Sequence, residues 1–125
     1  MNKIIKTKNA PLVENAPFSQ AVQKGSFVFI SGQLGKNPKN NQLVEDFEKQ
    51  AKQALDNLFA ILKEAGCTDK NVVKVTVFLD DFNNFSIFNK IYKEYFSDQL
   101  PARSAFEVNR LAASAQVEIE AIAML

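Results

Sequence analysis

Two stretches of the chain repeat their apolar residues at three- and four-residue intervals, a period typical of amphipathic helices. The first stretch begins after Asp46 and ends at Gly66, a residue suited to the position just beyond a helix. Its apolar positions are Phe47, Ala51, Ala54, Leu55, Leu58, Ile61, Leu62 and Ala65. The second stretch, with an N-cap expected at Asn83 or Asn84, contains Phe85, Phe88, Ile91, Tyr92, Tyr95 and Phe96. We predict that both helices are core elements and that the aromatic stripe packs rather than binding a cofactor.

Alternating or continuous apolar runs predict strands before, between and after these helices. The strongest is residues 71–79, which is β-branched at most positions and is expected to lie inside a sheet rather than at its edge. Residues 21–30 predict two short strands around Lys24-Gly25, where glycine supplies the positive φ of a tight hairpin. Further strands are expected near residues 3–7, 103–108 and 116–123, with loops at 8–18 and 37–41.

The order strands, helix, strand, helix, strands predicts an α+β fold with one mixed β-sheet and two helices packed on one face. A chain of 125 residues with 46% hydrophobic residues fits a single domain over residues 1–125. The second face of such a sheet must be solvated or covered by another chain. Self-association would cover it.

A lone guanidinium opens the alternating segment that follows Pro101. The period of two places Ser104, Phe106 and Val108 on one face, predicted to be core, and Arg103, Ala105 and Glu107 on the other.

The last alternating run places Glu118 and Glu120 on one face, roughly 7 Å apart. Strands joined by a short connection usually pair, so we expect the guanidinium of Arg103 to lie beside these two carboxylates. The group is then either a buried ion cluster or a carboxylate-binding pocket with an acid or base beside it.

The strand before the first helix ends in Ser31-Gly32-Gln33. Glycine there, having no Cβ, lets another backbone or a ligand approach, and Ser31 offers a donor and two acceptor sites. The alternative is a strand-end bulge with a solvated serine.

Composition narrows the candidate functions. The formal charge of +1 comes from 15 basic and 14 acidic residues scattered along the chain, so charge does not support dedicated nucleic-acid binding. The chain has no histidine and a single cysteine, Cys67, which excludes an intrachain disulfide and the usual zinc site. We predict that Cys67 acts as a small apolar residue and that no metal or cofactor is bound. No apolar stretch is long enough to span a bilayer, and we expect no membrane association and a cytoplasmic location.

Four segments together resemble the RidA/YjgF family of reactive-intermediate deaminases, whose members are also labelled endoribonuclease L-PSP. They are Ala16-Pro17-Phe18-Ser19-Gln20-Ala21, Ile30-Ser31-Gly32-Gln33, Pro101-Ala102-Arg103-Ser104 and Val117-Glu118-Ile119-Glu120-Ala121-Ile122-Ala123. The resemblance runs from near Ile4 to the C-terminus. It implies a chorismate-mutase-like subunit in a homotrimer, with ligand clefts between neighbouring subunits. The implied reaction converts 2-imino or enamine acids, such as 2-iminopropanoate and 2-iminobutanoate, to 2-oxo acids and ammonia without a cofactor.

The resemblance also implies the residues of the site. Arg103 would bind the substrate carboxylate, and Glu118 would orient or deprotonate the attacking water. The remaining substrate-binding positions are Ser31, Gly32, Phe18, Ala105 and Asn89. Phe18, Ala105 and Ala16 stand where the family often has tyrosine, cysteine and glycine, which puts the rate or the substrate range in question rather than the reaction class.

Two other functions stay open. One is an endoribonuclease or translation inhibitor, ranked lower because ribonuclease acid–base chemistry is usually served by histidine and the chain has no basic stripe. The other is a non-catalytic module that binds small ligands or acts as a chaperone in the same clefts.

Overall fold

A computed structural model describes residues 2–125, which form one six-stranded sheet and two α-helices. The strands are β1 (Lys3–Ile5), β2 (Ala21–Lys24), β3 (Phe27–Leu34), β4 (Val72–Leu79), β5 (Ala102–Glu107) and β6 (Val117–Met124), and the helices are α1 (Phe47–Glu64) and α2 (Phe85–Tyr95). The sheet order is β1-β2-β3-β6-β4-β5, with β4 and β5 parallel and the other neighbours antiparallel. The predicted α+β fold with a mixed sheet is confirmed.

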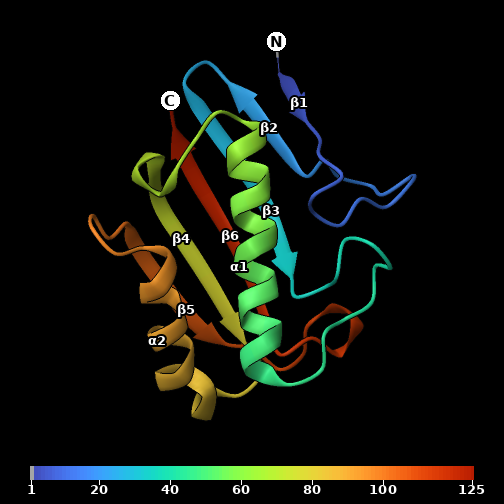
Figure 1. Ribbon diagram of the computed structural model, residues 1–125, viewed down its shortest axis with the longest axis vertical. Helices are drawn as coiled ribbons and strands as arrows, with labels where there is room; N and C mark the ends of the chain where they lie inside the picture. Colours follow the sequence, from blue (N-terminus) through green and yellow to red (C-terminus); the bar gives the residue numbers. More distant parts are fainter. Residues whose placement is uncertain (1) are drawn as a thin grey trace.

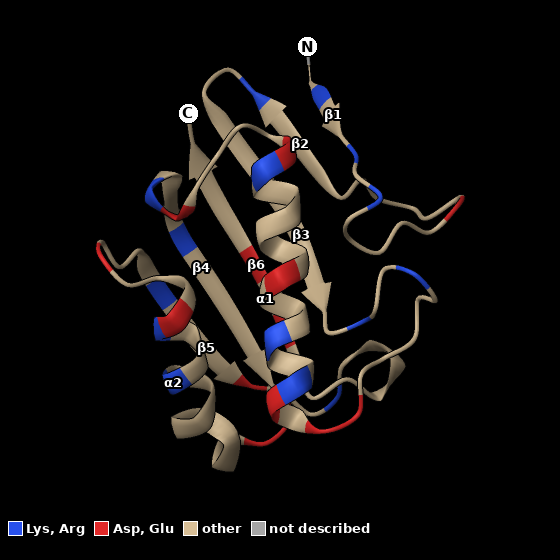
Figure 2. Ribbon diagram, viewed as in Figure 1, with Lys and Arg blue, Asp and Glu red and all other residues tan. Residues whose placement is uncertain are grey.

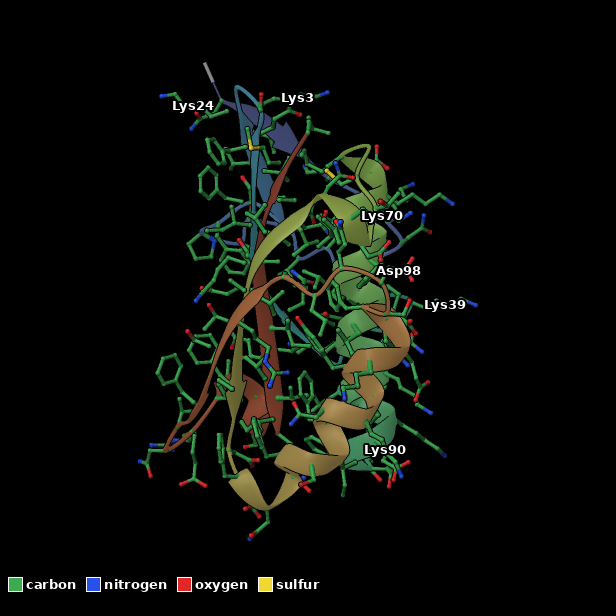
Figure 3. All side chains as sticks on the ribbon, turned by 90° about the vertical axis from the view of Figure 1, so that its left-hand side faces the viewer. Lys3, Lys24, Lys39, Lys70, Lys90 and Asp98 are labelled. Atoms are coloured by element: carbon green, nitrogen blue, oxygen red, sulfur yellow. The ribbon has the colours of Figure 1, made fainter. Side chains whose placement is uncertain are left out.

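Both helices lie on the same side of the sheet (Figures 1 and 3). The apolar stripe of α1 is fully buried there, at Ala51, Ala54, Leu55, Leu58, Ile61 and Leu62. Within residues 2–125 no helix is long and apolar enough to cross a bilayer.

The ends of α1 follow from local chemistry. The carboxylate of Asp46 accepts a hydrogen bond from the N–H of Lys49 at 3.2 Å, as an N-cap does. Gly66 adopts φ 81°, and the N–H groups of Gly66 and Cys67 donate to the carbonyls of Lys63 and Leu62. These two bonds satisfy carbonyls that the helix leaves free, so the predicted termination at Gly66 is confirmed.

The start of α2 differs in detail from the prediction. Asn84 occupies the N-cap position, but its side chain makes no capping hydrogen bond. A 3₁₀ turn, Phe82–Asn84, precedes the helix, and the carboxylate of Asp81 accepts from the N–H of Asn83 at 2.9 Å. Asp81, two residues after the end of β4, therefore caps the turn that leads into the helix.

The strand order corrects the expectation that the last two strands pair with each other. β4 lies between β5 and β6 (Figure 1), pairing with β5 in parallel and with β6 in antiparallel register. The crossover through α2 places β5 beside β4, and β6 then returns between β3 and β4. β4 is thus an interior strand, as its apolar sequence predicted.

The predicted faces of β5 are also reversed. Arg103 and Ala105 are paired with Val75 and Val77, whose side chains are buried beneath the helices. Phe106, predicted to be core, lies opposite Phe78 on the other side of the sheet and is 52% exposed. Strand alternation fixes which residues share a face of the sheet, but not which of the two faces is buried. The apolar side chains did not identify the buried face, because both faces of this sheet carry them.

We call the side of the sheet that faces away from the helices the open face. Its side chains include Phe27, Phe29, Lys74, Thr76, Phe78, Ser104, Phe106, Glu118, Glu120, Ile122 and Met124. Phe27 and Phe29 have ring centroids 6.0 Å apart and are each almost half exposed. Contiguous apolar side chains of this kind are typical of a surface that another chain covers.

Candidate functional site

The guanidinium of Arg103 lies against one side of α2. Its Nη2 donates a hydrogen bond to Oδ1 of Asn89 at 2.8 Å. Its Cζ lies 4.8 Å from the ring centroid of Tyr92, with Phe85 and Phe88 at 5.7 and 6.0 Å. These four residues all belong to α2. Through residues 2–125, Arg103 forms no ion pair with a carboxylate, so the predicted contact with Glu118 or Glu120 is wrong for a single chain.

Glu118 belongs to β6. It lies on the open face, opposite Leu34 at the end of β3. Its carboxylate packs directly against Gly32, so closely that a Cβ added at Gly32 would clash with the carboxylate oxygen. Gly32 is therefore a point of close approach, but the group that approaches it is a side chain of the same protein rather than the backbone or ligand that was predicted. Partial burial raises the pKa of Glu118, and the neighbouring charge of Glu120 raises it further.

Ser31 lies in a β-bulge, where the register of β3 against β6 shifts between Ile30 and Gln33. Its Oγ donates to the carbonyl of Ser19 at 2.6 Å, and its N–H donates to the carbonyl of Gln20 at 2.9 Å. The hydroxyl proton is thus used within the protein. What Ser31 can offer a ligand is an acceptor, suited to an N–H group or a water molecule.

A cavity of about 750 Å³ opens beside this bulge, between β3 and the loop before β2. Phe18, Ser19 and Gly32 are among its lining residues, and Phe18 is 63% exposed. Buried Gln20 fixes the loop by donating to the carbonyls of Thr7 and Pro11 at 3.1 and 2.8 Å. Sequence reasoning gave Gln20 no structural role, because its partners are loop carbonyls with no sequence signal of their own.

The candidate residues form two half-sites within one chain. Arg103, Ala105 and Asn89 lie on the helix side at the β5 edge, whereas Ser31, Gly32 and Glu118 lie at the end of β3. β6, which carries Glu118, and β4 lie between β3 and β5, and Glu118 faces the open side of the sheet whereas Arg103 faces the helices. Over residues 2–125 no three side chains from histidine, cysteine, aspartate and glutamate gather as a metal site would require.

Comparison with known proteins identifies the family. Residues 7–125 match the family model described as Endoribonuclease L-PSP. The chain belongs to this family. Over 125 residues it is 50% identical to the 2-iminobutanoate/2-iminopropanoate deaminase of Mus musculus, with 99% of this chain and 92% of that protein covered. The human protein of the same name is 46% identical, with 99% and 90% covered.

Solved structures agree with this assignment. The E. coli protein TdcF, solved with bound serine, is 39% identical and superimposes with a TM-score of 0.94 over 98% of each chain. The YjgF gene product of E. coli is 42% identical, with a TM-score of 0.93 over 98% of each chain. The predicted resemblance to RidA/YjgF proteins is confirmed.

Proposed function

We propose that the protein hydrolyses 2-imino acids and their enamine forms, such as 2-iminopropanoate and 2-iminobutanoate, to 2-oxo acids and ammonia. The observation that carries this proposal is the half-buried Arg103, whose charge is met by an amide and aromatic rings rather than by a carboxylate. A planar fork of donors matches a carboxylate in two-pronged fashion. Curated relatives about half identical to this chain carry the deaminase name, and TdcF holds serine, which also bears a carboxylate.

The separation of the half-sites supports catalysis between subunits. Arg103 faces the helices and Glu118 faces the open side of the sheet, so a substrate held by Arg103 would meet the Glu118 of a neighbouring chain, where the β5 edge of one chain contacts the β3 end of another. The exposed aromatic side chains of the open face supply an apolar surface for such contact. We infer a homotrimer with three shared clefts, where the number three comes from the family resemblance.

Each residue of such a shared cleft then has its own role in the reaction. Arg103 holds the substrate carboxylate and so fixes the adjacent C=N carbon. Glu118 takes a proton from water as its oxygen attacks that carbon, and the raised pKa of Glu118 makes it a stronger base than an ordinary glutamate. Glu118 passes this proton to the nitrogen, which gives a carbinolamine. Glu118 then takes the proton of the new hydroxyl group and passes it to the nitrogen as well, so that the C–N bond breaks, the C=O bond forms and ammonia leaves with the 2-oxo acid. Ser31 accepts a hydrogen bond from the substrate N–H, and Phe18, which lines the cavity beside Gly32, contacts the substrate.

Ammonia release tests the proposal. 2-Iminopropanoate is generated by an amino-acid oxidase acting on alanine, and its decay and the ammonia formed are followed with and without the protein. We expect faster decay with the parent and no acceleration with Arg103→Ala. An unaccelerated decay with the parent would overturn the proposal.

The endoribonuclease alternative is tested with the same samples. Figure 2 shows Lys and Arg interspersed with Asp and Glu rather than gathered in one stripe, so the charge pattern does not favour a track for RNA. Cleavage of RNA that persists in Arg103→Ala and survives further purification would support that alternative.

We expect the protein to elute at three times its chain mass of 14.0 kDa when light scattering measures the eluting peak. Phe29→Glu, which places a charge on the open face, should lower that mass, because an unpaired charge is costly to bury at an apolar contact. Ile87→Glu is the matched control, since Ile87 is similarly exposed but lies on α2. A parent of monomer mass at micromolar concentration would refute the shared cleft together with the trimer.

Glu120→Gln should move the acid limb of the kcat/KM profile to lower pH. The charge of Glu120 raises the pKa of Glu118, so its removal lets Glu118 lose its proton at lower pH and become a base there. The control is Glu64→Gln, an equal charge change at the exposed end of α1. If the acid limb of the kcat/KM profile stays at the same pH, Glu118 is not the group whose ionisation produces that limb.

A further inference from the structure

The guanidinium of Arg103 is restrained from two directions by α2. Oδ1 of Asn89 accepts a hydrogen bond from Nη2 at 2.8 Å, and the centroid of the Tyr92 ring lies 4.8 Å from Cζ. A cation this close to an aromatic centroid is attracted by the ring, more strongly where water is excluded.

The position of Tyr92 is set by packing rather than by its hydroxyl. The side chain is 5% exposed, and its Oη is buried without a hydrogen-bond partner among residues 2–125. Its ring stacks on Phe96 with centroids 4.6 Å apart and lies 5.8 Å from Phe88. Burial raises the pKa of Tyr92 to about 12, so the hydroxyl stays protonated at neutral pH. A buried polar group without a partner costs stability, which leaves the ring as the useful part of this side chain.

The hydrogen bond to Asn89 leaves Arg103 with one pair of N–H donors that can bind a carboxylate. A guanidinium can hold a carboxylate on the edge formed by Nε and Nη2 or on the edge formed by Nη1 and Nη2. Nη2 contributes one N–H to each edge, so a single bond to Asn89 occupies one edge and leaves the other with two parallel donors. An amide partner also leaves the positive charge uncompensated.

We infer that Asn89 and Tyr92 are positioning residues, which hold the plane of Arg103 so that its remaining two-donor edge meets the substrate carboxylate. The inference rests on the proposed role of Arg103 as the carboxylate anchor. It replaces the expectation that Asn89 contacts the substrate itself. A long side chain ordered before the ligand arrives loses less conformational freedom on binding, and this raises affinity for the carboxylate.

Side-chain NMR tests the restraint without any activity measurement. The chain contains two arginines, Arg103 and the exposed Arg110, so isotope-labelled arginine gives two guanidinium groups to compare. We expect separate, ring-shifted Nη proton signals for Arg103 and averaged signals for Arg110. Tyr92→Leu and Asn89→Ala should each average the signals of Arg103, whereas Tyr92→Phe should leave them resolved.

The matched control is Phe59→Leu, which removes a ring from the contact between the helices without touching Arg103 or Tyr92. It should leave the Arg103 signals resolved. Averaged Arg103 signals in the parent, or resolved signals in both Tyr92→Leu and Asn89→Ala, would overturn the inference.

Inhibition by product analogues shows whether the restraint serves carboxylate recognition. In the parent, pyruvate should compete with the imine far better than neutral pyruvamide does. Tyr92→Leu should reduce this preference about tenfold, as loss of one desolvated cation–π contact would, while Phe59→Leu and Tyr92→Phe keep it. An unchanged preference in Tyr92→Leu would refute the positioning role even if the parent hydrolyses imines. Conversely, a parent without imine hydrolysis but with resolved Arg103 signals would refute the proposed function and leave the restraint standing.

Discussion

Glu118→Gln should slow imine hydrolysis by roughly 10²–10⁴-fold, the usual contribution of a positioned acid–base group. Glutamine keeps the size of the side chain and its hydrogen-bonding capacity but cannot take a proton from water. The rate of ammonia release, measured beside the melting temperature on one sample, separates chemistry from folding. A parent-like rate in a folded Glu118→Gln protein would reassign Glu118 to a structural role.

The same substitution should not reduce stability at neutral pH. The pKa of Glu118 is raised in the folded state, so its favourable contribution is full below the unfolded pKa and is lost as pH rises through the folded pKa. Glutamine never carries the negative charge that burial and Glu120 disfavour. We therefore expect Glu118→Gln to melt within a few degrees of the parent or slightly above it at pH 7. A clear fall in melting temperature would indicate that the ionised Glu118 is held by favourable contacts.

Gly32→Ala offers an independent way to disturb the same carboxylate. The added methyl group would clash with the Glu118 carboxylate. This carboxylate is the flexible end of a side chain, so we expect it to move while the backbone stays in place. Gly35→Ala is the contrasting variant, because its added Cβ meets the backbone of Gln50 at the start of α1. We expect Gly32→Ala to lose activity and stay folded, and Gly35→Ala to lose stability. A fully active Gly32→Ala would show that the position of Glu118 over Gly32 does not matter for catalysis.

The helices and the central strand could be predicted because their signals are local. The apolar period and Gly66 located α1 to within a few residues, and the β-branched run located β4. Strand order is a long-range property, and neither the short connection before β6 nor its alternation showed that β4 would lie between β5 and β6.

The candidate residues could be named from the sequence one at a time, but their arrangement in space could not be predicted. Gly32 was recognised as a point of close approach, yet its partner, Glu118, comes from a strand about 85 residues further on, and only the register of β3 against β6 reveals it. Arg103 was placed on the wrong face because the aromatic side chains of the open face resemble core residues. A surface rich in apolar side chains has the composition of an interior, and the sequence of one chain does not distinguish the two.

Arg103→Lys should lower kcat/KM by roughly ten- to a hundredfold, equivalent to about 1.5–3 kcal/mol of lost transition-state binding. Lysine keeps the positive charge, can donate to Asn89 and can lie over the ring of Tyr92, so the contacts with α2 survive in part. What lysine lacks is the planar pair of donors that fixes the orientation of a carboxylate. The loss therefore measures two-pronged recognition rather than charge.

The matched control is Arg110→Lys, the same chemical change at the other, exposed arginine, and it should have no effect. Oligomer mass and melting temperature are measured on the sample used for kinetics, so that a folding defect is not mistaken for lost recognition. If Arg103 served only to pack against α2, the ammonium of lysine would serve nearly as well, because a single donor satisfies Asn89 and the ring needs only a cation. A folded Arg103→Lys protein of unchanged mass that hydrolyses 2-iminopropanoate at the parent rate would refute the assignment of Arg103 as the carboxylate anchor, and with it the division of the reaction between Arg103 and Glu118.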